Sequence, residues 1–181
     1  VGVANFNAVR SDTLLRAHLS QFFKGDYNQA IERFKKLNVN GDLEQRTQLN
    51  IGLLQKASGD YPQAIDTFEQ ISDSSVYWKQ AHTNKGNIYF ITKQYQDAMD
   101  HYRAVLEKDA QYAVALYNLS VVNARIGNRE EANTARSRAF SIDPGLRERV
   151  GSQELSDITA VLDGRPEPLE RLSGLFFSFQ G

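Results

Sequence analysis

Apolar side chains recur at three- and four-residue intervals along most of this chain, the spacing that places them on one face of an α-helix. In residues 96–109 the apolar residues Ala98, Tyr102 and Val105 follow this spacing, and no proline interrupts the stretch. The preceding stretch, residues 76–93, also lacks proline and is rich in residues that favour helices. The pattern therefore predicts two consecutive helices with a short turn between them.

The same pattern is repeated at a fixed interval of 34 residues. The decapeptide GDYNQAIERF begins at Gly25, its near copy GDYPQAIDTF begins at Gly59, and weaker copies begin at Lys93 and Gly127. One alanine position is common to the copies and is occupied by Ala30, Ala64, Ala98 and Ala132. A repeat of this length indicates stacked helix pairs. We predict one unit at each of residues 11–44, 45–78, 79–112 and 113–146.

Small residues have a packing role in this prediction. The repeated alanine lies where the second helix of a unit crosses the first, and Gly52 and Gly86 do the same from the first helix. A larger side chain at these positions would push the helix axes apart. The fourth unit has Arg129 and Arg136 where the other units have aromatic residues. Its second helix is therefore predicted to be the least well packed, or to be covered by the segment after it.

Three segments lie outside the repeats: an N-terminal extension (residues 1–10), a capping helix (147–163) that covers the apolar end of the stack, and a proline-containing linker with an apolar tail (164–181). The tail carries Leu175, Phe176, Phe177 and Phe179. Apolar residues at this density predict a segment that docks on protein. Three interpretations stay open: the tail docks on the chain's own body, it docks on a second copy, or it begins a truncated membrane segment or domain.

The 34-residue step, together with Gly86, Tyr89, Tyr95, Ala98, Tyr102 and Pro144, resembles the tetratricopeptide repeat family. The resemblance covers about 136 of the 181 residues. It implies an all-α, right-handed solenoid of antiparallel helix pairs, with the capping helix and tail after it. It also implies a non-catalytic interaction scaffold that binds a peptide segment or a partner protein in a concave groove lined by the first helix of each repeat.

Matching positions to the family places the groove at Leu15, Leu19, Arg46, Leu49, Asn50, Leu53, Thr83, Asn84, Asn87, Phe90, Tyr117, Asn118, Val121 and Arg125. The asparagines recur at the repeat interval and have a mechanism: an amide side chain donates to and accepts from an extended peptide backbone. The alternative is that these asparagines mainly bond neighbouring helices.

Charge and composition narrow the classes of partner. Lys and Arg number 21 against 22 Asp and Glu, so no net field draws the chain to nucleic acid. No apolar run approaches the roughly 18 residues that span a bilayer, so we expect no membrane insertion by this fragment. The chain begins at Val1, and a rival function is therefore an accessory domain of a larger membrane-anchored or extracytoplasmic bacterial protein that organises an assembly. The compartment, cytoplasm or periplasm, stays undetermined. If the apolar tail docks on a second copy, the protein would self-associate.

The sequence carries little that predicts chemistry. There is no cysteine, and His18, His82 and His101 form no HExxH motif. His101 lies near Asp97 and Asp100, which is more typical of a solvated helix face than of a metal site. No phosphate-binding loop or nucleophile elbow occurs. We therefore predict no catalytic residue, no metal and no cofactor, and a protein that is not an enzyme.

Overall fold

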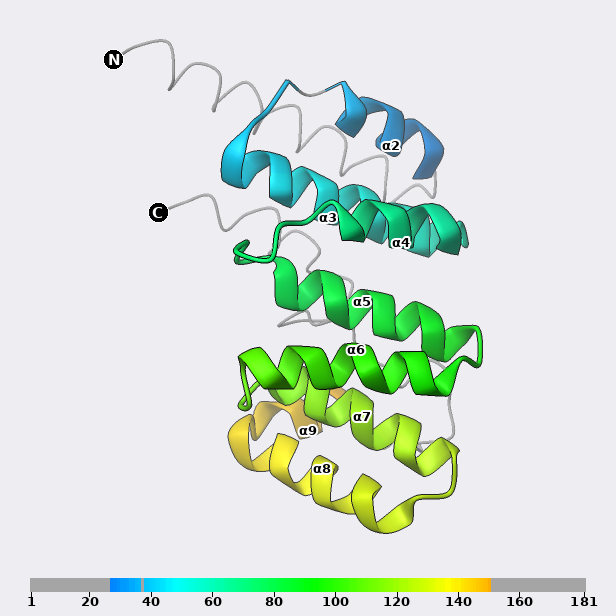
Figure 1. The fold of residues 1–181 in the computed structure, drawn as a ribbon, viewed down its shortest axis with the longest axis vertical. Coiled ribbons are helices and arrows are strands. Elements are labelled where there is room, and N and C mark those ends of the chain that lie inside the picture. Colours follow the sequence, from blue (N-terminus) through cyan, green and yellow to red (C-terminus); the bar gives the residue numbers. More distant parts are fainter. Residues whose placement is uncertain (1–26, 37, 151–181) are drawn as a thin grey trace, which may run out of the picture. The chain divides into compact units, whose positions relative to one another are not determined.

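The computed structural model describes residues 27–36 and 38–150. This part of the chain is helical and contains no strand, which confirms the all-α prediction (Figure 1). It falls into two compact bodies, at residues 27–75 and 76–150. The first body contains α2 (Tyr27–Lys35), α3 (Gly41–Ser58) and α4 (Tyr61–Glu69). The second contains α5 (Trp78–Ile91), α6 (Tyr95–Lys108), α7 (Ala113–Arg125), α8 (Arg129–Ile142) and α9 (Gly145–Val150).

Each helix pair is joined by a turn of the same construction. Gly59 donates its N–H to the carbonyl of Lys56, and Asp60 donates to that of Gln55. The equivalent bonds recur at intervals of 34 residues after α5 and after α7. The first residue of these turns has a positive φ, 86° at Gly59 and 91° at Gly127. Glycine adopts this left-handed conformation without a steric penalty and ends the first helix of the pair.

The turn between α5 and α6 departs from this rule in one residue. Lys93 occupies the glycine position with a φ of 64°, where a side chain carries a steric penalty. The turn still forms the two bonds that close the others, from Lys93 N–H to the Phe90 carbonyl and from Gln94 N–H to the Tyr89 carbonyl. Figure 1 shows α5 and α6 side by side on either side of this turn.

Close contact between paired helices depends on a glycine that faces an aromatic ring. A Cβ atom added to Gly52 would lie 2.4 Å from Phe68 of α4, and one added to Gly86 would lie 2.5 Å from Tyr102 of α6. Phe68 is 1% exposed and Tyr102 is fully buried. The glycine thus leaves space for the ring that the second helix inserts against the first.

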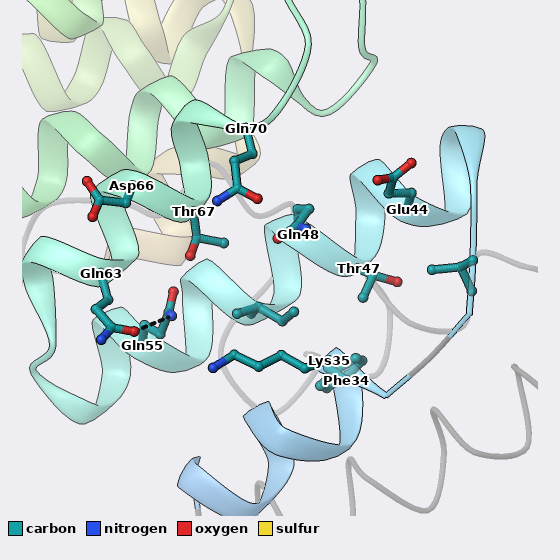
Figure 2. Close-up of a pocket in the computed structure, with 12 residues that line it drawn as sticks. Phe34, Lys35, Glu44, Thr47, Gln48, Gln55, Gln63, Asp66, Thr67 and Gln70 are labelled. Carbon is teal, nitrogen blue, oxygen red and sulfur yellow. Dashed lines mark hydrogen bonds between the residues drawn. The ribbon is translucent and has the colours of Figure 1, made fainter.

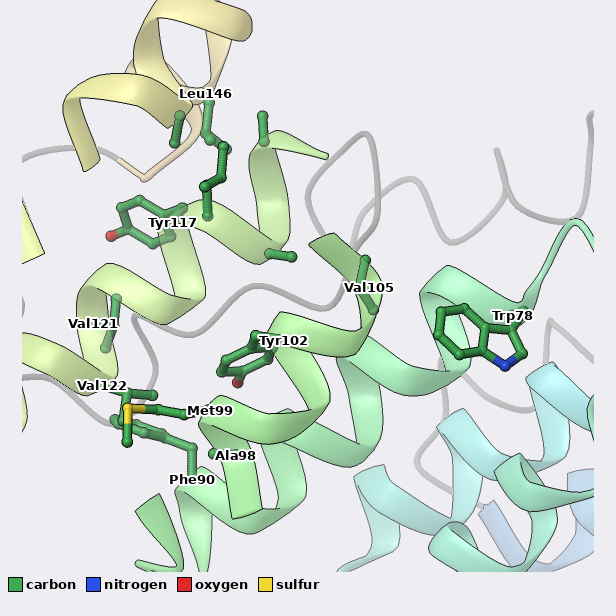
Figure 3. Packing of buried hydrophobic residues seen from close by; sticks show 14 residues of the cluster. Trp78, Phe90, Ala98, Met99, Tyr102, Val105, Tyr117, Val121, Val122 and Leu146 are labelled. Carbon is green, nitrogen blue, oxygen red and sulfur yellow. The ribbon is translucent and has the colours of Figure 1, made fainter. Parts of the chain in front are cut away.

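The predicted alanine positions are buried in the structure. Ala30, Ala64 and Ala98 are fully buried and Ala132 is 2% exposed, so a larger side chain would not fit at this position of the repeat. In the first body Ala30 packs with Ile31, Phe34, Ile51 and Leu54 between α2 and α3. In the second body a larger cluster joins α5, α6, α7 and α8 around Phe90, Tyr102 and Tyr117 (Figure 3).

Helix α8, the second helix of the last pair, buries few of its side chains. In α8 only Ala132 and Ala139 are buried, and Arg136 lies partly exposed with its guanidinium donating to Asn133 at 2.7 Å. The short helix α9 follows and places Leu146, which is fully buried, in the core cluster. Both observations agree with the expectation that the second helix of the fourth unit is the least well packed, or is covered by the segment after it.

Several predicted segments lie outside the described residues. These are the N-terminal extension, the first helix of the first predicted unit, residues 151–163 of the predicted capping helix, and the apolar tail with its linker. Helix α9 begins at Gly145, two residues before the predicted start of the cap, and α3 begins at Gly41, four residues before the predicted start of the second unit.

Candidate functional site

The predicted groove residues are distributed over the first helices of the pairs. Leu15 and Leu19 lie outside the described residues. Helix α3 carries Arg46, Leu49, Asn50 and Leu53, α5 carries Thr83, Asn84, Asn87 and Phe90, and α7 carries Tyr117, Asn118, Val121 and Arg125. Positions separated by three and four residues share one face of a helix, so each set occupies a single face of its own helix.

Burial divides this set unevenly. Arg125 is exposed, and the other eleven described members are buried. Phe90, Tyr117 and Val121 belong to the core cluster of the second body (Figure 3). The guanidinium of Arg125 lies 5.7 Å from the centre of the Phe90 ring, which places an exposed cation at the edge of the buried aromatic group. Burial raises the pKa of Tyr117, and the nearby Arg136 opposes this rise, so the phenol stays protonated at neutral pH.

Two of the asparagines connect helices. The side-chain oxygen of Asn87 on α5 accepts the hydroxyl of Tyr102 on α6 at 2.7 Å and the amide nitrogen of Asn118 on α7 at 3.0 Å. Both lone pairs of that oxygen are therefore used to join three helices. Asn84 instead donates to the carbonyl of Gln80 in its own helix at 2.8 Å. In the second body the bonds of Asn87 and Asn118 therefore correspond to the alternative that the asparagines bond neighbouring helices.

Asn50 on α3 behaves differently. It is 2% exposed, and its amide nitrogen has no hydrogen-bond partner among the described residues. A buried donor without an acceptor costs about 1–3 kcal/mol. An acceptor supplied from outside the described residues would remove that cost.

A cavity of about 480 Å³ opens on the opposite side of α3. It lies between α2 and α4, and its lining from α3 consists of Glu44, Thr47, Gln48, Ile51 and Gln55. At 100° per residue, this face is turned away from the face of Arg46, Leu49, Asn50 and Leu53 by roughly half a turn. The sequence analysis did not single out any residue of this cavity.

A second cavity, of about 560 Å³, lies over α7 between α6 and α8. Its lining corresponds to that of the first cavity with a shift of 68 residues, which is two repeat lengths. Lys35, Gln48, Ile51 and Gln55 of the first lining match Arg103, Leu116, Leu119 and Asn123 of the second. On the following helix, Gln63, Asp66, Thr67 and Gln70 match Glu131, Thr134, Ala135 and Arg138. The repeat therefore builds the same hollow in the second and fourth units. This recurrence of polar residues at helix positions next to the core was the sequence signal that could have revealed it.

The third unit has an aromatic stack at the corresponding positions. His82, Tyr89 and His101 replace Gln48, Gln55 and Thr67 of the second unit. The His82 ring stacks on Trp78 with 3.8 Å between ring centres, and the His101 ring stacks on Tyr89 with 5.2 Å between centres. His101 is thus packed against other rings, and no cluster of three or more metal-ligand residues occurs within residues 27–36 and 38–150.

A charged contact joins the ends of three helices in the second body. Lys79 of α5 donates to the carboxylate of Asp109, just after α6, at 2.6 Å, and its ammonium lies 5.0 Å from the centre of the Tyr112 ring. The Lys79 bond holds the pKa of Asp109 below its usual value, although partial desolvation opposes it. Burial, aided by the Asp109 charge, raises the pKa of Tyr112 to about 12. The arrangement is a structural clamp, with no group poised for proton transfer near neutral pH.

Family comparisons agree with the repeat seen in the helices. Residues 46–74 and 80–112 each match a model of the tetratricopeptide repeat. These two segments of the chain are therefore recognised as tetratricopeptide repeats. Both matched segments begin within the first helix of a pair and extend past the end of its second helix. No curated protein matches the sequence.

Solved structures of other tetratricopeptide repeat proteins share the fold. A crystal structure of MamA aligns over 70% of this chain and 74% of its own, with 25% identity and a TM-score of 0.57. MamA residues 41 to the end from Desulfovibrio magneticus RS-1 align over 74% of this chain and 76% of that one, with 22% identity and a TM-score of 0.58. YrrB, described as a TPR protein with an unusual peptide-binding site, aligns over 71% of this chain and 66% of its own, with 21% identity and a TM-score of 0.56.

Tetratricopeptide repeat proteins bind proteins or peptides and are generally non-catalytic scaffolds, and the repeats make this chain a protein–protein interaction scaffold. Among the described helices, none combines the length and the apolar character needed to cross a membrane.

Proposed function

We propose that this protein binds an extended segment of a partner protein on the face of the first helices that carries the predicted groove residues. The proposal joins the family resemblance of those positions with the chemistry of α3. The polar residues Arg46 and Asn50 alternate with Leu49 and Leu53 along one helix face, which suits a peptide with both apolar side chains and a hydrogen-bonding backbone. YrrB, a protein of the same fold, is described as having a peptide-binding site, which supports the same class of ligand here.

The observation that carries the proposal is the amide nitrogen of Asn50, which is buried without an acceptor among the described residues. A carbonyl of a bound peptide is the acceptor such a group requires. In the second body the Asn87 oxygen accepts from both Tyr102 and Asn118, so we assign these two asparagines to holding the helices in place. The asparagine at the α3 position is therefore the member of the ladder whose amide is left for a partner.

The experiment is a binding measurement with the intact chain. A partner is first captured and its binding segment mapped to a synthetic peptide, whose affinity is then measured by calorimetry. Asn50→Ala should weaken binding at least tenfold, because a buried hydrogen bond of about 1.4 kcal/mol is lost. Asn28→Ala removes the same side chain from an exposed position of α2 and is the control. Equal affinities for the wild-type chain and Asn50→Ala would place the partner on another surface.

The rival function, an accessory domain of a membrane-anchored or extracytoplasmic protein, stays a prediction from sequence. Transmembrane helices in the reading frame that flanks this segment would favour it. Docking of the tail, residues 174–179, is a separate prediction. Deletion of residues 172–181 tests it: loss of thermal stability in a monomer indicates docking on the chain itself, and conversion of an oligomer to a monomer indicates docking on a second copy.

A further inference from the structure

Gln55 contributes an unused acceptor to the cavity over α3. The residue is 4% exposed, and its side-chain nitrogen donates to the oxygen of Gln63 on α4 at 3.4 Å. Its side-chain oxygen has no hydrogen-bond partner among the described residues. Figure 2 shows this oxygen turned from the Gln63 bond toward the side of the cavity where Thr67 lies. A buried carbonyl oxygen without a donor costs free energy, and a ligand that donates a hydrogen bond to it would remove that cost.

The lining suits a polypeptide backbone better than a compact small molecule. Of the twelve lining residues only Phe34, Val39 and Ile51 are apolar, whereas small-molecule pockets are lined mainly by apolar and aromatic groups. Four of the others are glutamines, at positions 48, 55, 63 and 70. A primary amide both donates and accepts, as does each peptide unit, so a row of glutamines can follow an extended backbone.

The cavity also has the length of an extended peptide. Its lining along α3 runs from Glu44 to Gln55, twelve residues, which spans about 16 Å at the helical rise. An extended chain of about five residues covers that distance. Ile51 lies midway along this lining and offers one apolar contact, and the hydroxyl of Thr47, which donates to the Leu43 carbonyl at 2.7 Å, keeps a lone pair for a second donor.

The equivalent cavity over α7 lacks the unused group. Asn123, which replaces Gln55, donates to the Leu119 carbonyl at 3.0 Å, and its oxygen accepts the amide of Asn128 at 3.4 Å. Arg138, which replaces Gln70, donates to the Ala110 carbonyl at 2.9 Å. The same hollow is therefore satisfied from within the chain in the fourth unit and left with an open acceptor in the second.

We propose that the cavity over α3 is a second peptide-binding site, which holds about five residues of an extended partner segment by hydrogen bonds to their backbone amides. One backbone N–H of that segment donates to the Gln55 oxygen. This site lies on the side of α3 opposite to Asn50, so it does not depend on the function proposed above.

A library of random linear heptapeptides displayed on phage, selected against the intact chain, supplies the probe, and the selected peptides are then synthesised. Gln63→Ala should weaken their binding at least tenfold, because Gln63 is exposed and positions the Gln55 amide. Glu131→Ala, at the corresponding exposed place over α7, is the matched control and should change affinity less than twofold. In the peptide, N-methylation at one backbone position should abolish binding, while replacement of side chains should have graded effects.

Gln55→Leu provides a second measurement, because it removes the unused oxygen and keeps the volume. Its melting temperature should equal or exceed that of the wild-type chain. Because the substitution also removes the bond from the Gln55 nitrogen to Gln63, it is compared with Gln63→Ala, which removes that bond alone. A melting temperature several degrees below that of Gln63→Ala would show that the oxygen is satisfied within the protein, which would overturn the proposal. The proposal also fails if the library yields no binder, or if its binders tolerate Gln63→Ala. Binders lost in Asn50→Ala but kept in Gln63→Ala would support the opposite face and refute this one.

Discussion

The α5–α6 pair and the α7–α8 pair are consecutive repeats of one unit, yet their helices pack in different ways. In the first pair Gly86 lies against the buried ring of Tyr102, with no room for a Cβ atom. In the second pair the same two positions are Ser120 and Arg136. Ser120 is buried and its hydroxyl donates to the Tyr117 carbonyl at 2.6 Å, while Arg136 is partly exposed. Where the second helix has no ring at this position, the first helix does not need a glycine opposite it.

The difference extends to the polar groups. Tyr102 closes the Asn87 network through its hydroxyl, whereas Arg136 bonds to Asn133 in its own helix. Lys79 ties the start of α5 to Asp109, but the position equivalent to Lys79 in α7 is Ala113. The α5–α6 pair thus has a buried ring directly against its glycine and a Lys79–Asp109 contact, and neither recurs at the equivalent positions of the α7–α8 pair. We expect it to tolerate substitution less well than its neighbour.

The largest expected effect is at the aromatic position. Tyr102→Ala should lower the free energy of unfolding by about 3–5 kcal/mol, because a fully buried ring is removed and the Asn87 oxygen loses a donor. Arg136→Ala, the same change one repeat later, should cost less than about 0.5 kcal/mol. Urea denaturation of the two variants gives both values. Similar losses would contradict the difference in packing between the pairs.

The glycine position gives the next effect. Gly86→Ala forces its Cβ toward the Tyr102 ring, an overpacking cost of about 1–3 kcal/mol. The better helix propensity of alanine returns about 1 kcal/mol, so a net loss of about 0–2 kcal/mol is expected. Ser120→Ala should change stability by less than about 1 kcal/mol, since only the local hydroxyl bond to Tyr117 is removed. If Gly86→Ala stabilises the protein, the tight contact is wrong.

At the turn residues the α5–α6 pair is the one that a substitution should stabilise, and the α7–α8 pair is the one that the reverse substitution should destabilise. Lys93→Gly should stabilise the protein by about 1 kcal/mol, because it relieves a side chain held at positive φ. Gly127→Lys places a lysine in the equivalent left-handed turn after α7 and should destabilise by a similar amount. Thermal melts at matched concentration test both. A lower melting temperature for Lys93→Gly would refute this assignment of strain.

The smallest effect concerns pH. The pKa of Asp109 is lowered in the folded state, so its contact with Lys79 stabilises the protein at pH values above the unfolded pKa, about 3.9. That contribution is lost as pH falls through the folded pKa, which lies lower. Asp109→Asn should therefore flatten the acid side of the stability profile by a small amount, because the pair is partly exposed. An acid limb identical to that of the wild-type chain would show that the contact contributes nothing.

The repeat interval was enough to predict the helices and their tight contacts. Glycine, alanine and aromatic residues that recur every 34 positions leave few ways to pack, and Gly86 against Tyr102 is what they imply. The candidate sites were harder to predict. Family matching selected Asn118 together with Asn50, because both have the same place in the repeat, and only contacts from other helices distinguish a bonded amide from an unpaired one. The sequence analysis gave Gln55 no role, because its unused oxygen is apparent only once its bond to Gln63 of α4 is known.

Trp78 gives the molecule a useful optical property. It is the single tryptophan of the chain and is 6% exposed in the core cluster of the second body, where the ammonium of Lys108 lies 3.6 Å from its ring centre. Its fluorescence reports on residues 76–150, whereas far-ultraviolet circular dichroism sums the helices of both bodies. Coincident transitions of the two signals in denaturant would mean that the bodies unfold together, and separate transitions would give the stability of each body from one sample.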